Sequence, residues 1–160
     1  MERQYLSSGD LSMKKIITTY IIFFAVFILV PITYAADWQW ICSTDVMTVS
    51  FDKDSIRKSE RNKYFVWIKS EYTESEGVKR SKDFKLAEPI SYALVRWEVD
   101  YKNESSRIQS SVIYDKNGAS LANFTDEYSL IRFKPIVPGS IGEEIFYVTF
   151  AEYQNKYGKV

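Results

Sequence analysis

Hydrophobic and polar residues alternate along much of the chain beyond residue 36, at the spacing of half-buried β-strands. The clearest example covers residues 93–101, where three of the four even positions are charged. Its odd positions are Ala93, Val95, Trp97, Val99 and Tyr101. Because successive side chains of a strand point to opposite faces of a sheet, this alternation predicts a strand with one buried face.

Five further segments have the same character and are rich in aromatic and β-branched residues. They predict strands over residues 38–42, 47–51, 64–72, 107–114 and 120–124. The last two flank Asp115, Lys116, Asn117 and Gly118, and both Asn117 and Gly118 readily adopt positive φ. We therefore expect these two strands to be antiparallel neighbours joined by a hairpin turn.

Residues 71–88 interrupt this pattern. The segment is crowded with charged residues and has Gly77 near its middle. It predicts a long exposed loop or an irregular hairpin, which serves either as a solvated connection or as a loop that contacts a ligand.

The spacing of apolar residues changes again near the C-terminus. Pro138 and Gly139 end the strand pattern, and Ser140 with Glu143 three residues later forms a capping box. Apolar residues then follow at helical spacing, which predicts a helix over about residues 141–155. The expected fold class is α+β: an antiparallel sheet of about five to six strands with this C-terminal helix packed on one face.

The N-terminal segment resembles a secretory signal peptide. Lys14 and Lys15 precede an apolar run over residues 16–30, and small residues follow up to Ala35 and Ala36. This order of charged, apolar and small residues predicts cleavage after Ala35, so that the mature chain begins at Ala36. The protein is then exported, to the periplasm, the cell surface or the medium.

The alternative for this segment is an uncleaved membrane anchor. A helix of the apolar run spans only about 22 Å, short of the ~30 Å hydrocarbon core, which favours cleavage. Met13 directly precedes the lysine pair, whereas Glu2 and Asp10 are unusual in the charged start of a signal peptide. We therefore predict a non-native extension over residues 1–12, a signal peptide over residues 13–35 and a single domain over residues 36–160.

Charge and composition limit the classes of function. Lys and Arg together equal Asp and Glu in number, so the chain has no field that attracts nucleic acid, and a membrane is expected to matter only through the signal segment. The chain has no histidine, which excludes Ser-His and Cys-His nucleophilic sites and most zinc sites. Glu98 and Asp100 are expected to be solvent-facing polar residues of a strand. We predict no enzyme activity, no cofactor and no metal.

Aromatic residues are expected to supply much of the core, because a small domain without disulfides needs apolar bulk. Trp67 and Trp97 are predicted to lie in that core. The alternative is a stacking platform for sugars, which Trp38 and Trp40 could join. Cys42 is the only cysteine, so we expect a buried free thiol, with an intermolecular disulfide as the alternative.

The order of these motifs resembles that of the surface-adhesin protein E family of bacteria. The resemblance covers an aromatic opening at residues 38–41, an Asp-x-x-Ser-Ile element at residues 52–56 and the stretch at residues 135–140. Its individual landmarks are Trp67, Trp97, Tyr114, Gly118, Pro138, Gly139 and Ser140. The family implies an exported domain with an antiparallel sheet and a packed helix, and an adhesin that binds host proteins such as vitronectin, laminin and plasminogen.

The chain departs from the family pattern at two positions. Many members carry one cysteine directly after the residue equivalent to Asp100 and another in the C-terminal helix, where this chain has Tyr101 and Phe150. Since both replacements are apolar, we expect packing between them in place of a disulfide. The better known adhesin is also lipidated, whereas here the only cysteine lies well inside the mature chain.

The sequence therefore predicts an exported, non-enzymatic binding module that contacts host matrix or cell-envelope proteins. The candidate contacts are the clustered cations Lys79, Arg80, Lys82 and Lys85, which could meet an acidic partner. The alternative is a periplasmic or secreted glycan-binding domain that uses exposed aromatic residues.

Overall fold

The computed structural model describes residues 36–125 and 132–159. The expected extension over residues 1–12 and the expected signal peptide over residues 13–35, with Ala35, lie outside the described residues. Ala36, the expected first residue of the mature chain, is the first residue described.

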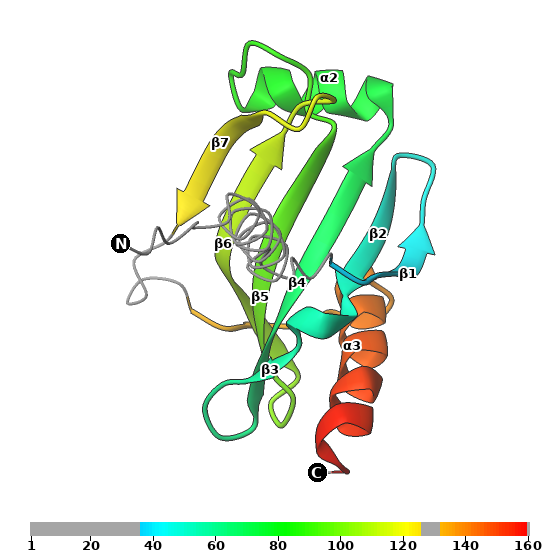
Figure 1. Ribbon diagram of the computed structural model, residues 1–160, viewed down its shortest axis with the longest axis vertical. Helices are drawn as coiled ribbons and strands as arrows, with labels where there is room; N and C mark the ends of the chain where they lie inside the picture. The colour runs from blue at the N-terminus through cyan, green and yellow to red at the C-terminus, as the bar shows by residue number, and fades with distance from the viewer. Residues whose placement is uncertain (1–35, 126–131, 160) are drawn as a thin grey trace, which may run out of the picture. The chain divides into compact units, whose positions relative to one another are not determined.

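The described residues contain eight strands, and every pairing between them is antiparallel. The strands are β1 (Trp38–Ser43), β2 (Met47–Asp52), β3 (Arg57–Lys58), β4 (Lys63–Tyr72), β5 (Tyr92–Asp100), β6 (Ser105–Tyr114), β7 (Ser120–Thr125) and β8 (Lys134–Pro135). Six of them form a continuous sheet in the order β1-β2-β4-β5-β6-β7 (Figure 1). The short strands β3 and β8 pair with β4 and β6, and a 3-10 turn, η1 (Lys53–Ser55), precedes β3.

The hairpin between β6 and β7 is confirmed. One oxygen of the Asp115 carboxylate, Oδ1, accepts hydrogen bonds from the backbone N–H groups of Ala119 at 2.8 Å and Asn117 at 2.9 Å. These bonds hold the pKa of Asp115 below its usual value, and the bond from Ala119 has the largest effect. Gly118 has a φ of 80°, which a residue without a Cβ adopts easily, so the turn uses positive φ at this position.

The C-terminal helix is also confirmed, as α3 (Ile141–Tyr157), two residues longer than expected. The Ser140 hydroxyl accepts a hydrogen bond from the N–H of Glu143, whose own carboxylate accepts one from the N–H of Gly139 at 2.7 Å. Gly158, at a φ of 90°, ends the helix. The predicted α+β class, an antiparallel sheet with a C-terminal helix, is therefore correct.

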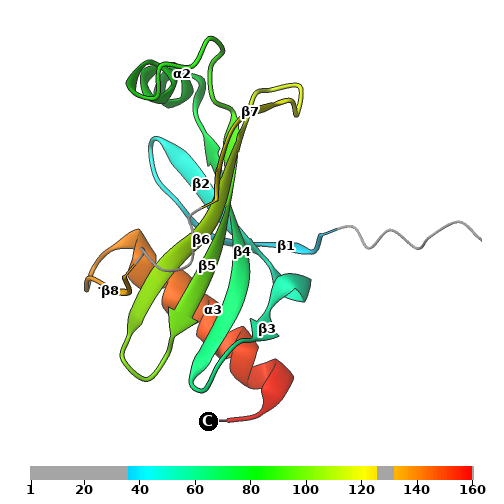
Figure 2. The same cartoon turned by 90° about the vertical axis from the view of Figure 1, so that its left-hand side faces the viewer.

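The main core lies between α3 and one face of the sheet (Figure 2). Its centre is Tyr64 on β4, whose ring stacks on that of Tyr153 at 4.9 Å between centroids. The Tyr64 hydroxyl is 2.8 Å from the hydroxyl of Thr149, which in turn donates to the carbonyl of Ile145. A polar pair inside the core is thus satisfied internally.

A stacked aromatic pair joins the end of β5 to α3. The rings of Tyr101 and Phe150 have centroids 5.2 Å apart and planes inclined by 24°. The packing expected between these two residues is therefore confirmed.

The structure corrects the expectation for Glu98 and Asp100, which are buried with exposed fractions of 2% and 8%. The carboxylate of Glu98 accepts hydrogen bonds from Arg107 Nε at 2.6 Å and from Ser59 at 2.8 Å. Asp100 instead accepts hydrogen bonds from the turn between β5 and β6, including one from the N–H of Asn103. Alternation within one strand cannot reveal the partners of Glu98, because Ser59 and Arg107 lie on other parts of the chain.

The expectation that both tryptophans lie in the core is correct for Trp97, which packs against the main core. Trp67 is half-buried and neighbours Val66 and Ile68, which are in the core, so its side chain points to the opposite face of the sheet. Cys42 is half-buried rather than fully buried and packs against the main core as a free thiol. Burial, and secondly the charge of Glu144, raises the pKa of the Cys42 thiol.

The structure also corrects the loop or irregular hairpin expected for residues 71–88. β4 runs on to Tyr72, and α2 (Glu74–Asp83) follows it. The hydroxyl of Thr73 caps the helix, and acidic residues in the first turn and basic ones in the last complement the helix dipole. The charges that suggested a loop are therefore part of what stabilises a helix.

Gly77 does not break α2 but allows it to lie close to the chain that leads into β5. A Cβ at this position would be only 2.0 Å from the carbonyl oxygen of Ile90. Ile90 belongs to a second, smaller apolar cluster with Ala93 and Ile113. The close approach at Gly77 thus holds α2 against this end of the sheet.

Candidate functional site

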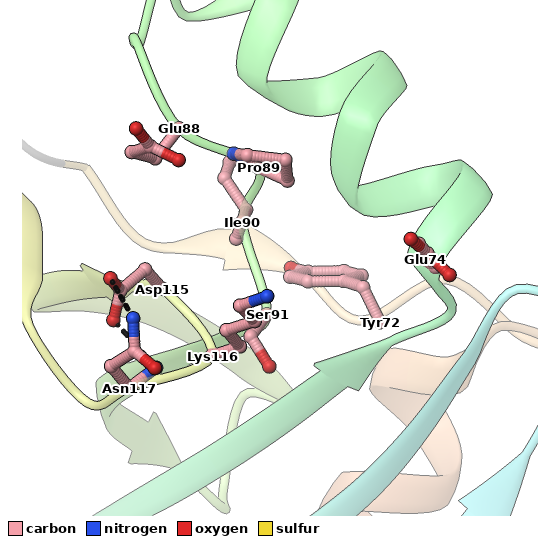
Figure 3. A pocket seen from close by; sticks show the side chains of 9 residues that line it. All are labelled: Tyr72, Glu74, Glu88, Pro89, Ile90, Ser91, Asp115, Lys116 and Asn117. Atoms are coloured by element: carbon pink, nitrogen blue, oxygen red, sulfur yellow. Dashed lines mark hydrogen bonds between the residues drawn. The ribbon is translucent and has the colours of Figure 1, made fainter.

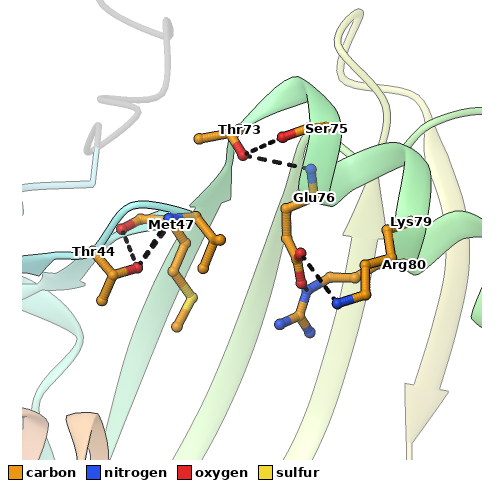
Figure 4. Close-up of polar contacts among 8 residues, drawn as sticks. Thr44, Met47, Thr73, Ser75, Glu76, Lys79 and Arg80 are labelled. Atoms are coloured by element: carbon orange, nitrogen blue, oxygen red, sulfur yellow. Dashed lines mark hydrogen bonds and ion pairs between the residues drawn. The ribbon is translucent and has the colours of Figure 1, made fainter.

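Helix α2 crosses one end of the sheet, where it connects β4 to β5 (Figure 1). The backbone N–H of Thr73 donates to the carbonyl of Val46 at 3.0 Å, which ties the start of the helix to the turn between β1 and β2. Thr44 orders that turn, because its hydroxyl accepts a hydrogen bond from the N–H of Met47 (Figure 4). α2 contains only ten residues, and the bond between Thr73 and Val46 fixes its N-terminal end to the β1–β2 turn.

The four predicted contact residues lie on α2 or in the turn after it, but they do not share one role. Lys79, Lys82 and Lys85 are exposed, and only Lys79 approaches a carboxylate of the described residues, Glu76 at 3.8 Å. Lys82 and Lys85 have no ion-pair partner within the described parts of the chain. Of the four predicted contact residues, Lys82 and Lys85 are therefore the two that a partner could contact without breaking an existing ion pair.

Arg80 differs from the three lysines, because it folds back onto the helix and the sheet. Its Nε donates to Oε1 of Glu76 at 2.8 Å (Figure 4). Its guanidinium group lies 4.6 Å from the centroid of the Tyr72 ring. Arg80 therefore has contacts that hold α2 against β4.

A hollow of about 560 Å³ lies beside the N-terminal end of α2 (Figure 3). It is bounded by the segment before β5 and by the turn between β6 and β7, and its lining residues are Tyr72, Glu74, Glu88, Pro89, Ile90, Ser91, Asp115, Lys116 and Asn117. The Asp115 carboxylate in this lining is occupied by the turn itself. The hollow offers polar contacts from both the segment before β5 and the turn between β6 and β7.

Sequence reasoning missed two phenylalanines at the other end of α2. Phe84 and Phe124 are 50% and 46% exposed, and their ring centroids are 6.1 Å apart. Phe84 caps the C-terminus of α2, and Phe124 lies on the edge strand β7. The available signal was a single phenylalanine in each of two polar stretches, residues 82–85 and 123–126.

Aromatic and basic side chains also gather on the sheet face that α3 does not cover. Lys69 Nζ lies 5.2 Å from the centroid of the Tyr92 ring, and the guanidinium of Arg96 lies 4.4 Å from that of Phe65. Trp40, at the edge of this face, is 65% exposed. This is the part of the molecule that bears on the glycan-binding alternative.

The buried Glu98 has the contacts of a structural ion pair rather than of a general base. Arg107 Nη2 lies 2.6 Å from its Oε2, and Gln109 donates to the same oxygen at 3.2 Å. Removing one partner of such a pair leaves an uncompensated buried charge, so we assign Glu98 to stability.

Within residues 36–125 and 132–159, no three acidic or cysteine side chains are arranged to hold a metal ion. None of the helices described is long and apolar enough to cross a membrane.

Comparison with known proteins identifies the family. No curated protein matches the chain. The family model of surface-adhesin protein E matches residues 38–149, which include all the strands described above and the first half of α3. Since this match covers well over half of the sequence, the chain belongs to the surface-adhesin protein E family.

Proposed function

We propose that the protein is an exported, non-enzymatic binding module that attaches to a host matrix protein or a cell-envelope protein. Membership of a surface-adhesin family supports a binding role at a surface. The observation that carries the proposal is the pair Lys82 and Lys85, which are exposed and have no ion-pair partner within the described residues. Lys79 adds a third exposed cation, while Arg80 is proposed to hold the helix that presents them.

Local charge of this kind acts mainly on recognition. The chain as a whole has a formal net charge of zero, so no long-range field draws it to acidic surfaces in general. A group of exposed cations on one rigid element selects an acidic patch on a partner and increases the rate of association. Exposed charges contribute little to folding, and Lys82 adds only a small stabilising effect at the C-terminus of α2, so these lysines can be changed with little loss of stability.

Neutralising the three lysines tests this role. The triple variant Lys79→Gln, Lys82→Gln, Lys85→Gln should lose binding to immobilised vitronectin or laminin, with the melting temperature lowered only slightly. A matched control removes the same charge elsewhere by changing the exposed Lys102, Lys134 and Lys159 to Gln. Equal binding by both triple variants would rule out the assignment.

Arg80 needs a separate variant, because it has internal contacts. Arg80→Gln removes its bond to Glu76 and its position over Tyr72. The melting temperature should fall, and binding should weaken only as far as α2 is loosened. A drop in affinity at full stability would instead make Arg80 a direct contact.

Export is tested by fractionation and N-terminal sequencing of the mature protein. We expect Ala36 as its first residue, in the periplasm, at the cell surface or in the medium. Retention of residues 13–35 on a membrane-bound product would instead establish the uncleaved anchor.

A second candidate, binding of a glycan, is favoured by one observation. Trp40 is 65% exposed beside the sheet face that α3 does not cover, where sugars could stack. Titration with peptidoglycan and capsule fragments should then change tryptophan fluorescence, and Trp40→Ala should remove most of the change. If the tryptophan fluorescence of the wild-type protein does not change, the glycan-binding candidate is ruled out and only the protein-binding proposal remains.

A further inference from the structure

Strand β7 is the last strand of the sheet within the described residues. β7 pairs with β6 along one side, and no other described strand pairs with it. An edge strand presents unpaired N–H and C=O groups, which can form a ladder with any extended chain that lies alongside. This makes β7 a geometrically suitable place for strand addition.

β7 lacks most of the features that usually protect such an edge. Its six residues, Ser120–Thr125, include no charge and no proline. The register irregularity of the β6–β7 pair lies at the start of the strand, next to Tyr114, and leaves the following residues in regular register. Natural edge strands are commonly protected by charged residues, prolines or bulges. β7 has no charged residue and no proline, so its sequence does not prevent another strand from pairing with it.

The opposite edge, β1, is less open. A bulge between Trp40 and Cys42 interrupts its pairing in the middle of the strand. Its start is held by Asp52, which accepts a hydrogen bond from the N–H of Asp37. α3 also contacts this strand. Of the two edges of the described sheet, β7 is therefore the one better suited to pairing with an incoming strand.

An exposed aromatic pair lies beside β7. Phe124 pairs in register with Ser111, which continues across the sheet to Val95 and Ile68, so its ring is on the face that carries both apolar clusters. Phe84 reaches the same face from the end of α2. A strand added to β7 would place alternate side chains on this face, where one apolar residue could cover both rings.

The charges around Phe84 indicate the character of the partner. Lys82 and Lys85 belong to the same tight turn, in which the N–H of Lys85 donates to the carbonyl of Lys82 at 3.1 Å. Asp83 offsets one of these charges, and the turn stays net positive. Carboxylates at one end of the incoming segment would complement it.

We propose that β7 is a strand-addition site for an extended, acidic segment of a partner protein. The segment pairs with the outer edge of β7, places an apolar side chain against Phe84 and Phe124, and directs its carboxylates to Lys82 and Lys85. The inference rests on the proposed binding function and gives that function a mode of recognition.

The probe is a synthetic octapeptide of alternating threonine and valine that ends in two glutamates. Amide hydrogen exchange of the purified protein is measured by NMR with and without the peptide. Because only every second amide of an edge strand points outward, the peptide should slow exchange at alternate positions within Ser120–Thr125. A peptide that ends in two lysines should bind about tenfold more weakly.

Variants separate the contributions of the side chains. The double variant Lys82→Glu, Lys85→Glu should reverse the preference, so that the lysine-ended peptide binds better. Phe124→Ala should weaken both peptides, whereas Tyr147→Ala, which removes an exposed aromatic side chain of α3, should weaken neither. Retained far-UV circular dichroism shows that each variant folds.

Three results would overturn the inference. The first is unchanged exchange at residues 120–125 with the peptide present at millimolar concentration. The second is protection without peptide that rises with protein concentration, because a second copy of the chain would then occupy the edge. The third is peptide binding that ignores the charge reversal.

The two proposals fail in different ways. Binding of vitronectin or laminin through the lysines, with β7 unprotected in that complex, would refute strand addition and leave the adhesion function intact. Protection of β7 by the acidic peptide, with no binding to any matrix or envelope protein, would refute the adhesion function and leave the edge site intact.

Discussion

At the scale of single residues, the pair Tyr64 and Thr149 shows how this core contains polar groups without a penalty. Both side chains are fully buried, and their hydroxyls are 2.8 Å apart. Thr149 donates to the carbonyl of Ile145, so its oxygen is free to accept the proton of Tyr64. Because of this order of donors and acceptors, removing the Thr149 hydroxyl should cost more stability than removing the Tyr64 hydroxyl.

Tyr64→Phe should destabilise the protein by about 1 kcal/mol, because Thr149 keeps its bond to Ile145. Thr149→Val should cost more, about 1–3 kcal/mol, because the Tyr64 hydroxyl is then buried without its partner. Urea unfolding of both variants and of the double variant measures the difference. A double variant as unstable as the sum of the two would contradict this pairing.

The same tyrosine should affect stability at alkaline pH. Burial raises the pKa of Tyr64 above its ordinary value of about 10. A pKa raised on folding gives stability that is fully present below the unfolded-state value and is lost as the pH rises through the folded-state value. The free energy of unfolding should therefore fall above about pH 10, and less steeply in Tyr64→Phe. Parallel slopes for the two proteins in alkaline urea titrations would contradict this assignment.

At the scale of elements, most of the sheet and α3 could be predicted from the sequence, whereas α2 could not. Strands and α3 bury one face, so their apolar residues follow a period that the sequence displays. α2 buries chiefly Gly77 and Ser81, which carry no hydrophobic signal. The N-cap residue and the order of charges are visible at residues 73–82. A prediction based on the spacing of apolar residues nevertheless favours a loop, because the segment has Gly77 in its middle and many charged residues.

Gly77 gives the test of how α2 is held. Alanine favours helix over glycine by about 1 kcal/mol, so Gly77→Ala would stabilise a free helix. Here the new methyl group meets the carbonyl oxygen of Ile90, and overpacking of this kind costs about 1–3 kcal/mol. We expect a net loss of stability in chemical unfolding. Ser75→Ala, at an exposed position of the same helix, should be near neutral, and a stabilised Gly77→Ala protein would show that α2 does not approach the sheet this closely.

At the scale of the whole molecule, the candidate site and the main core lie on different apolar clusters. α3 packs on the cluster that contains Tyr64, whereas α2 and β7 border the cluster of Ile90, Ala93 and Ile113. The sequence indicated the lysines of the candidate site, since charge is visible residue by residue. It could not indicate the contact of Phe84 with Phe124 or the position of β7 at the edge of the described sheet, because both depend on the order of the strands.

The main cluster is closed at the C-terminal end of β5 by the Tyr101 and Phe150 stack, where many family members are expected to have two cysteines. A stacked pair stabilises by about 0.5–1.5 kcal/mol beyond the area it buries. The single variants Tyr101→Ala and Phe150→Ala should each destabilise the protein, and the double variant should lose less than their sum by that amount. Chemical unfolding of the four proteins measures the coupling. Since Cys42 is the only cysteine, a reducing agent should change none of the four in monomeric form, and additive losses would show that the two rings stabilise the fold independently.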